Sequence, residues 1–417
     1  MIRVLVFLIG LFVCNSLQAQ DIKKIKWEKD IKTLQKKLPE KHKYLFYVRN
    51  RAEFNKDINL LLSSCGSLSD LGIALKMQQL VARMGDSHTN INWGKFIDKN
   101  KQLPLTLYWF GDGIYVKQTV VENQKMLGKR ITKINQIPIK IVVDSLSTLI
   151  SQDNIALVKN QVPRLILNIE LLECFKFVND GKVIVETEDL DGNVESFEVK
   201  PSLMNQENRV ECDADSVAFS VKNLNEFFVD KYFKDEGIYY IQYNKCNGRE
   251  NPPYNFKGDI NTLPSFTEFE RRVVETINNE PIKKLIIDLR YNGGGNSYQG
   301  TGFVKKLSTI EKINQKGVLY VLIGRRTFSS AIINVMDFKG LTKAIYVGEE
   351  TGGKPNHFGE VKRFELPSSK MEVYFSTKFF RRAEKDMSTI NPDFKIEESF
   401  NDFKLGVDPV FEWIKKQ

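Results

Sequence analysis

Three short, almost wholly apolar runs in the second half of the chain limit its fold more than any other feature. They occupy residues 285–289, 318–323 and 344–347. Continuous apolar runs of this length are expected of strands whose sheet is covered on both faces. A further strand is predicted at 237–241, and a capping-box sequence at 265–268 predicts the start of a helix. This alternation of strands and helices predicts an α/β domain with a layered core.

The first half of the chain shows two other patterns. Apolar residues recur at helical spacing over 27–84, and Gly85 is placed to end the last helix. Short β-like runs dominate 103–200, and an Asp-Gly pair at 191–192 predicts a hairpin turn between two of them. We therefore expect a small helical N-terminal region and a separate β-rich module before the α/β domain.

The first 20 residues have the plan of a secretory signal peptide. Arg3 gives a basic tip, residues 4–14 are apolar, and cleavage after Ala19 is plausible. The apolar run is shorter than the roughly 20 residues that a membrane-spanning helix needs. We therefore expect an exported, periplasmic or secreted protein with no stable membrane span after cleavage, and an uncleaved anchor is the alternative.

The composition excludes several classes of protein. With 42% hydrophobic and 27% charged residues among 417, the chain is neither disordered nor a polytopic membrane protein. The net charge of +9 is dispersed among acidic residues, so nucleic acid is not an expected partner. The cysteines that follow the leader are too far apart for a thiolate metal site, and they predict either one or two disulfides or buried thiols. They are Cys65, Cys174, Cys212 and Cys246.

The glycine-rich sequence at 288–296 is the strongest local signal, because it directly follows a predicted buried strand. Its three consecutive glycines, 293–295, leave backbone N–H groups unobstructed. Such a turn can direct amides at a developing negative charge. A tight strand exit and a phosphate-binding loop are the alternatives, and no Gly-Lys-Ser/Thr sequence follows to favour the second.

Ser329 lies between the apolar run at 318–323 and a predicted helix. A serine in this place can be a helix N-cap. Alternatively, a hydroxyl at a helix start, next to a free N–H group, has the geometry to attack a carbonyl and to hold the resulting oxyanion. Its position after the glycine turn favours the second interpretation.

Two basic side chains are candidates to activate this hydroxyl. Lys354 follows the third apolar run, so it is expected at the same end of the sheet, and burial beside Ser329 would favour its neutral amine. His88 is expected in the loop 85–89 that leaves a helix, as a base or as a structural imidazole.

Taken together, these motifs resemble the carboxy-terminal processing (tail-specific) serine peptidases and their tricorn-core-like and interphotoreceptor retinoid-binding-like relatives. The resemblance runs from the Asp-x-His-Thr loop at 86–89, through a PDZ-like segment around 127–139, to Gly-Val-Asp-Pro at 406–409. It implies a crotonase/Clp-like superhelical catalytic domain, a protein or peptide substrate, and no metal or other cofactor. The implied plan is a signal peptide at 1–20, a helical region at 21–100, a degenerate PDZ-like module at 101–203 and an α/β catalytic domain at 204–417.

The resemblance also implies roles for single residues. Ser329 would be the nucleophile, and the N–H groups of Ser330 and of Gly294 or a neighbouring glycine would form the oxyanion hole. In the processing peptidases the base is a lysine, here Lys354, whereas in the tricorn-like branch it is a histidine in the early loop, here His88.

In that second branch an acid further along the chain supports the histidine, and Glu384 and Asp386 are the candidates. The chain departs from the family at Ile332, where Glu is frequent, and at Phe358, where some processing enzymes carry Gln. The resemblance predicts an exported serine endopeptidase that forms an acyl-enzyme on Ser329. The alternative is an inactive relative that binds a peptide or a lipophilic ligand.

Overall fold

The computed structural model describes residues 2–253 and 256–417, with the side chains of the first helix described from Ile22 onward. The chain forms two compact units. Unit 1 comprises Met1–Lys101, Asp144–Gln152 and Phe358–Phe379, and unit 2 comprises Gln102–Val143, Asp153–His357 and Phe380–Gln417. The side chains of the predicted signal peptide, 1–20, lie outside the described residues, and the predicted boundaries at 100 and 203 stay predictions.

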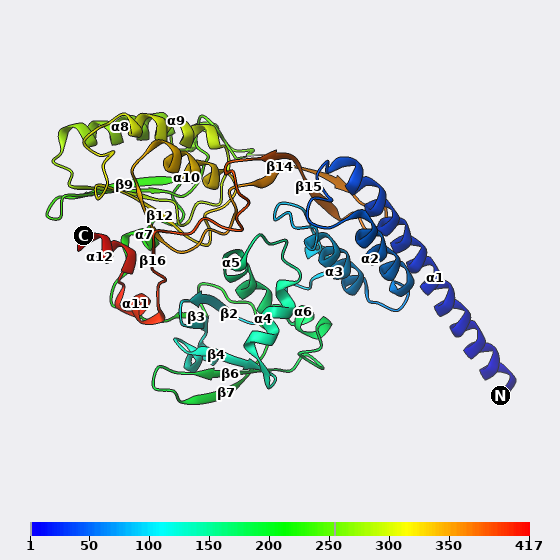
Figure 1. Cartoon of the computed structure of the whole chain (residues 1–417). Coiled ribbons are helices and arrows are strands. Elements are labelled where there is room, and N and C mark those ends of the chain that lie inside the picture. The colour runs from blue at the N-terminus through cyan, green and yellow to red at the C-terminus, as the bar shows by residue number, and fades with distance from the viewer. Residues whose placement is uncertain (1, 254–255) are drawn as a thin grey trace. The chain divides into compact units, whose positions relative to one another are not determined.

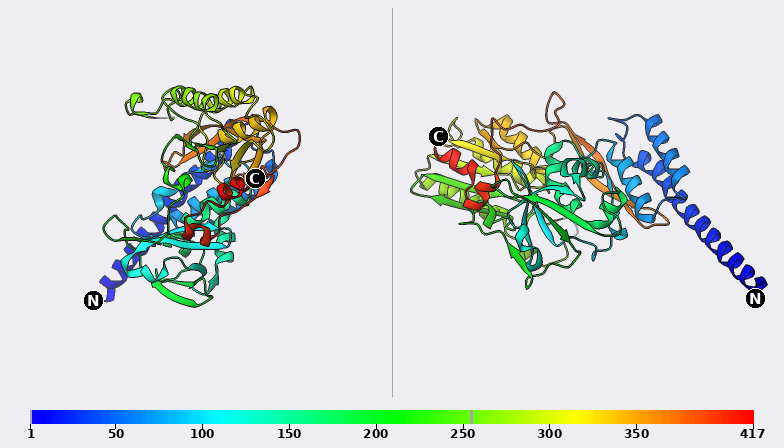
Figure 2. Two further views of the ribbon diagram at one scale, coloured as in Figure 1. Left: turned by 90° about the vertical axis from the view of Figure 1, so that its left-hand side faces the viewer. Right: turned by 90° about the horizontal axis from the view of Figure 1, so that it is seen from below.

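Unit 1 is a helical unit completed by a small sheet. Helices α1 (Ile2–Lys41), α2 (Arg51–Ser64) and α3 (Asp70–Ala82) precede the short strand β1 (Asn90–Ile91). Figure 2 shows α1, in blue, from two directions. Strand β1 pairs with β15 (Glu372–Phe380), which neighbours β14 (His357–Glu365). Among the described residues, no helix combines the length and the apolar character needed to cross a membrane.

The core of unit 1 follows the predicted helical periodicity. The predicted apolar faces of α1 and α3 are buried, and their side chains pack together. They carry Trp27, Ile31, Leu34 and Leu38 on α1, and Ile73, Met77 and Leu80 on α3. Residues of β14 and β15, among them Phe364 and Val373, join the same core. The helical prediction is therefore confirmed. The contribution of β14 and β15, which follow more than 260 residues after β1, was not predicted.

The β-rich part of unit 2 is a seven-stranded antiparallel sheet. Its main path runs through β2 (Leu105–Phe110), β3 (Gly113–Val120), β4 (Arg130–Ile134), β6 (Val183–Glu188) and β7 (Val194–Val199). Strand β5 (Ile137–Pro138) pairs with β4, and β8 (Arg209–Glu211) pairs with β3. The predicted hairpin is confirmed, because β6 and β7 pair on either side of Gly192. Helices α4 (Ile139–Ser147), α5 (Ile155–Ile166) and α6 (Ile169–Cys174) separate β5 from β6 in sequence.

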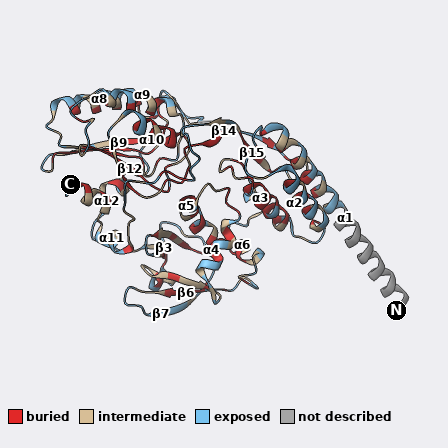
Figure 3. Cartoon of the chain, in the orientation of Figure 1, coloured by how far each residue is buried: buried red, intermediate tan, exposed pale blue. Residues whose placement is uncertain are grey.

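The α/β part of unit 2 contains a six-stranded sheet in the order β16-β13-β12-β11-β10-β9. The strands are β9 (Phe228–Phe233), β10 (Ile238–Tyr243), β11 (Lys284–Asp288), β12 (Leu319–Ile323), β13 (Ile345–Gly348) and β16 (Phe394–Lys395). All are parallel to their neighbours except β9, which is antiparallel to β10. The strands predicted from the three apolar runs and the strand predicted at 237–241 are confirmed, and Figure 3 shows the buried residues in red along β12.

Helices cover both faces of this sheet, as the apolar strands predict. One face packs against α8 (Phe266–Asn279), α9 (Ser297–Ser308) and α10 (Ser330–Leu341), which Figure 1 shows together in green to orange. The other face packs against α7 (Phe219–Lys222) and α12 (Pro409–Lys415), while α11 (Phe400–Leu405) packs against β2 and β3. The α/β prediction is therefore confirmed.

The start of α8 differs from the predicted capping box in one partner. The Ser265 hydroxyl accepts from the Glu268 N–H at 3.2 Å, as predicted. The carboxylate at this helix start, however, is that of Glu250, which accepts from the Ser265 hydroxyl at 2.5 Å and from the Phe266 N–H at 2.9 Å. Burial would raise the pKa of Glu250, but these hydrogen bonds lower it to about 2. Glu250, which lies 15 positions upstream of Ser265, thus supplies a carboxylate to the first N–H groups of α8.

The four cysteines predicted to remain in the mature chain are all free thiols. Cys65 and Cys246 are buried, Cys212 is half-buried and Cys174 is exposed. Burial raises the pKa of the Cys246 thiol to about 12, so this side chain behaves as a small buried hydrophobe. The buried-thiol alternative therefore holds for Cys65 and Cys246, and the other two cysteines are free thiols that are not buried.

Candidate active site

Three turns meet at one edge of the six-stranded sheet. Strands β11, β12 and β13 are adjacent and parallel, so their carboxyl ends lie at the same edge. The turn after β11 contacts the turn after β12, because the Leu289 carbonyl accepts from the Thr327 hydroxyl at 2.8 Å and the Asn292 carbonyl accepts from the Phe328 N–H at 3.0 Å. The turn after β13 joins them through a hydrogen bond from the Gly353 N–H to the Thr327 carbonyl at 3.2 Å. The predicted convergence of the three turns is confirmed.

Ser329 has an unusual backbone conformation at the start of α10. Its φ is 53° and its ψ is −124°, a combination that is rare for a residue with a side chain. It occupies the N-cap position, yet its hydroxyl makes no capping hydrogen bond to the helix. The Ser329 hydroxyl is therefore not used as an N-cap of α10.

The triple-glycine turn packs directly against Ser329. A Cβ atom added at Gly294, whose φ is +106°, would lie 2.8 Å from the Ser329 Cβ and 3.0 Å from the Ser330 nitrogen. No side chain fits at this distance, so glycine is required for the turn to approach the serine. The Ser330 hydroxyl holds the two turns together by donating to the Gly295 carbonyl at 2.6 Å.

The predicted oxyanion donors differ in their surroundings. Ser330 is the first residue of α10, where helix N–H groups have no partner within the helix and where the helix dipole favours negative charge. The Gly294 N–H instead donates to Asn292 Oδ1 at 2.9 Å. An oxyanion that binds the Gly294 amide would have to compete with this side chain. Their assignment as the oxyanion hole stays a prediction.

Asn292 lies in the glycine-rich sequence 288–296 that carries the resemblance, and sequence reasoning assigned it no role of its own. Its side chain is fully buried, and its Nδ2 donates to the Tyr243 carbonyl at 2.8 Å while its Oδ1 accepts from Gly294. It therefore anchors the glycine turn to the end of β10. An asparagine directly before three glycines is the signal that could have identified it.

Lys354 forms an ion pair with a buried carboxylate. Its Nζ lies 2.9 Å from Asp153 Oδ1, and the Asp153 side chain is 1% exposed. The adjacent Asn154 caps α5 and donates through Nδ2 to the Thr351 carbonyl at 3.0 Å. Sequence reasoning did not identify Asp153, although the Asp-Asn pair before an apolar run indicates a helix start.

His88 lies in unit 1, in the loop between α3 and β1. Its side chain is 9% exposed, and its Nδ1 lies 4.0 Å from Asp86 Oδ1. The His88 N–H also donates to Asp86 Oδ1, at 2.9 Å. The predicted loop leaving a helix is confirmed, and a buried carboxylate lies beside the imidazole.

The two acids suggested further along the chain, Glu384 and Asp386, are both exposed. Asp386 Oδ1 accepts from Asn356 Nδ2 at 2.7 Å, and the Glu384 carbonyl accepts from the Arg381 guanidinium. Water screens an exposed carboxylate, so neither has surroundings that strengthen its effect on a histidine. Their role as supporting acid stays a prediction.

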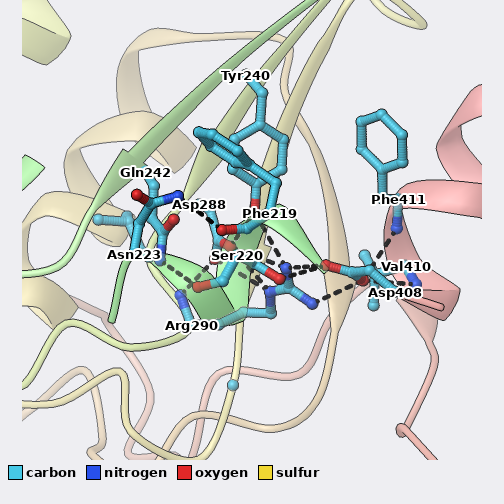
Figure 4. Close-up of polar contacts among 12 residues, drawn as sticks. Phe219, Ser220, Asn223, Tyr240, Gln242, Asp288, Arg290, Asp408, Val410 and Phe411 are labelled. Carbon is cyan, nitrogen blue, oxygen red and sulfur yellow. Dashed lines mark hydrogen bonds and ion pairs between the residues drawn. The ribbon is translucent and has the colours of Figure 1, made fainter. Parts of the chain in front are cut away.

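The Asp-Leu-Arg sequence before the glycine turn builds a buried polar cluster (Figure 4). The Arg290 guanidinium donates to Asp288, to Asp408 at 2.6 Å and to the Tyr240 hydroxyl at 3.1 Å. Burial opposes the charge of Asp408, but Arg290 holds the pKa of this carboxyl below its usual value. Asp408 also caps α12 by accepting from the Val410 and Phe411 N–H groups. The cluster therefore ties the C-terminal helix to the end of β11, where the glycine turn begins.

Comparison with known proteins agrees with this architecture. No protein-family model and no curated protein matches the chain. Among solved structures, mature CPAF complexed with lactacystin has a TM-score of 0.63 at 12% identity, over 95% of this chain and 98% of CPAF. The chain has the fold of CPAF.

A crystal structure of mature CPAF gives a similar match, with a TM-score of 0.61, 11% identity and coverage of 95% and 96% of the two chains. The photosystem II D1 C-terminal processing protease matches at a TM-score of 0.40 and 12% identity, over 93% of this chain and 98% of that protease. These proteins are tail-specific or tricorn-like serine peptidases. The matches to CPAF confirm the predicted resemblance and the predicted mixed α/β, multidomain fold class at the level of the fold.

Proposed function

We propose that the chain is an exported serine endopeptidase that hydrolyses protein or peptide substrates through an acyl-enzyme on Ser329. The backbone of Ser329 carries the proposal. A φ of 53° costs conformational energy, and a serine that merely capped α10 would not need it. Strain of this kind is typical of turns that present a nucleophile. The similarity of the fold to serine peptidases supports the same conclusion.

The nucleophile and the oxyanion donors of the proposed reaction come from the converging turns. Ser329 Oγ attacks the substrate carbonyl carbon as its proton passes to a base, and the carbonyl oxygen becomes an oxyanion. The Ser330 N–H and an N–H of the 293–295 segment stabilise that charge. The C–N bond then breaks as the base returns the proton to the leaving amine. Water hydrolyses the ester that remains and regenerates the Ser329 hydroxyl.

We assign the base to His88 and not to Lys354. Lys354 Nζ lies 2.9 Å from Oδ1 of the buried Asp153, so this side chain is engaged in an ion pair. An imidazole takes up and releases a proton near neutral pH, as a general base requires. In this proposal, the Lys354–Asp153 pair holds the turn after β13 in place.

Export is the second part of the proposal, and it is supported by the signal-peptide pattern at 1–20. We expect the mature protein to begin after Ala19 and to occur in the periplasm or the medium. N-terminal sequencing of protein recovered from these fractions tests the assignment. An intact Met1 in the recovered protein would support the uncleaved anchor instead.

Labelling with a fluorophosphonate probe tests the nucleophile. We expect the full chain to be labelled on Ser329, and a Ser329→Ala variant to remain unlabelled. Ser265→Ala is the matched control, since Ser265 also precedes a helix but uses its hydroxyl as a cap, and it should be labelled like the parent. An unlabelled parent chain that still binds peptides would overturn the proposal in favour of an inactive binding protein.

A further inference from the structure

A buried carboxylate organises the loop that carries His88. The side chain of Asp86 is only 3% exposed. Its Oδ2 accepts from His42 Nε2 at 2.9 Å and from the Thr89 hydroxyl, and its Oδ1 accepts from the His88 N–H at 2.9 Å. Three donors therefore hold one carboxylate in a fixed orientation inside unit 1.

The tautomer of His42 follows from its other contact. The Tyr44 N–H donates to His42 Nδ1 at 3.2 Å, so this nitrogen is an acceptor and carries no proton. The proton of the neutral ring is then on Nε2, which donates a hydrogen bond to Asp86 Oδ2. His42 is 1% exposed and thus serves as a fixed hydrogen-bond donor beneath the carboxylate.

These donors keep Asp86 ionised. Burial would raise the pKa of Asp86, but the hydrogen bond from His42, the nearby His88 and the hydrogen bond from Thr89 lower it to about 2. A negative charge is therefore present beside the His88 imidazole at neutral pH. Its Oδ1 lies 4.0 Å from His88 Nδ1.

We infer that Asp86, supported by His42 and Thr89, is the carboxylate that positions His88 for catalysis. A carboxylate on the Nδ1 side favours the tautomer that is protonated on Nδ1, and it leaves the lone pair of Nε2 as the proton acceptor. The distance between Asp86 Oδ1 and His88 Nδ1 is 4.0 Å, and catalytic contacts that are long in a free protein commonly tighten on substrate binding. Asp86 acts through His88 and does not itself contact the substrate.

This inference rests on the proposed function, and it replaces the acids first suggested for this role. Glu384 and Asp386 are exposed, whereas Asp86 is two residues from the histidine, buried and bonded to its backbone. A carboxylate in that position can orient the base in the free protein, before any substrate arrives.

Histidine NMR on the intact protein tests the pairing without a substrate. The chain has only three histidines, so His42→Gln and His88→Gln variants assign the imidazole signals. We expect neutral His88 to be protonated on Nδ1. In Asp86→Asn, the midpoint of the His88 titration should move to lower pH by about one unit, because the nearby negative charge is lost.

Asp57→Asn is the matched control. Asp57 is another ion-paired aspartate of unit 1, bonded to Arg49 at 2.7 Å and to Arg83 at 3.3 Å. Its loss should affect stability and leave the His88 titration unchanged. A neutral His88 protonated on Nε2, or a midpoint that does not move in Asp86→Asn, would overturn the inference. The tautomer is read on the parent protein, so the test remains valid even if Asp86→Asn fails to fold.

Kinetics separate this inference from the proposed function. With a peptide substrate, Asp86→Asn should lower kcat about 100-fold with an unchanged KM, because the base loses its orientation while binding is intact. An Asp86→Asn variant with the kcat of the parent overturns the positioning role and leaves the peptidase assignment intact. A parent chain that hydrolyses no peptide overturns the peptidase assignment, while the NMR result still decides whether Asp86 and His88 are coupled.

Discussion

Ser265 and Ser329 occupy equivalent places in the chain but have different backbones. Each is the residue immediately before a helix of the same α/β domain. Ser265 has a φ of −79°, and its hydroxyl accepts from the N–H three residues further on. Ser329 has a φ of 53°, and its hydroxyl makes no such bond. One serine stabilises its helix, and the other is held in a strained turn.

The difference shows that the tertiary fold can prevent a serine before a helix from acting as its N-cap. An N-cap hydroxyl contributes about 1 kcal/mol to a helix. At Ser329 this contribution is missing and backbone strain is added, so hydrogen bonds of the neighbouring turns must hold the conformation. Gly294 allows that approach, because it has no side chain to collide with Ser329. A site that lacks this stabilising hydrogen bond and also carries backbone strain is expected to be functional.

Replacing the two serines gives the largest expected contrast. Ser329→Ala should lower kcat for peptide hydrolysis about 10⁴-fold to 10⁶-fold, because the nucleophile is lost. Its thermal unfolding should stay close to that of the parent, since no cap is removed. Steady-state kinetics and a melting curve check both parts. A Ser329→Ala variant with parental kcat would show that the strained turn serves another purpose.

The second contrast lies between the two candidate bases. His88→Ala should lower kcat about 10²-fold to 10⁴-fold, as expected for loss of a general base. Lys354→Ala alone would leave the buried Asp153 unpaired, so the informative variant is Lys354→Ala combined with Asp153→Asn. We expect this double variant to stay within about tenfold of the parent kcat, since neither side chain transfers the proton.

The same assay can contradict this assignment. If the double variant were as inactive as Ser329→Ala while His88→Ala kept the parental kcat, the Ser/Lys dyad would be correct. A circular dichroism spectrum of each variant separates loss of the base from loss of the fold.

The sequence predicted those features whose signals are local. Continuous apolar runs predicted strands β10, β11, β12 and β13, and strand direction then placed the three turns at one edge. A periodicity of about 3.6 residues predicted the buried faces of α1 and α3. The Asp-Gly pair predicted the β6–β7 hairpin. In each case a few neighbouring residues determine the local structure.

Features that depend on distant residues were not predicted. Strands β14 and β15 complete the core of unit 1, although they follow β13 of unit 2 in sequence. No local pattern indicates that the chain contributes to unit 1 again at this point. The Glu250 carboxylate at α8 and the Asp153 partner of Lys354 are likewise brought into place by the tertiary fold. The φ of Ser329 also depends on packing, because serine has no intrinsic preference for that conformation.

A third test changes the approach of the glycine turn to Ser329. Gly294→Ala adds a Cβ that would lie 2.8 Å from the Ser329 Cβ, so the serine must shift. We expect kcat to fall about 100-fold, the typical effect of a misplacement near 1 Å. Gly317→Ala is the matched control, because Gly317 has a φ of +82° but nothing within 4 Å of an added Cβ.

The control separates backbone strain from displacement of the serine. Gly317→Ala should destabilise the protein by about 1–2 kcal/mol with no change in kcat. Equal losses of kcat in both variants would mean that general destabilisation, and not the position of Ser329, explains the effect of Gly294→Ala. Denaturant unfolding and initial rates measured on the same samples decide between the two.

The smallest expected effect is that of Ser265→Ala. Loss of the hydroxyl removes the bond to the Glu268 N–H and one of the contacts to Glu250, so the free energy of unfolding should fall by about 1 kcal/mol. The kcat should not change, because α8 packs on the sheet and contributes no residue to the three converging turns. A Ser265→Ala variant that lost activity but kept its stability would contradict this prediction. The difference in backbone angle between Ser265 and Ser329 would then no longer support Ser329 as the nucleophile.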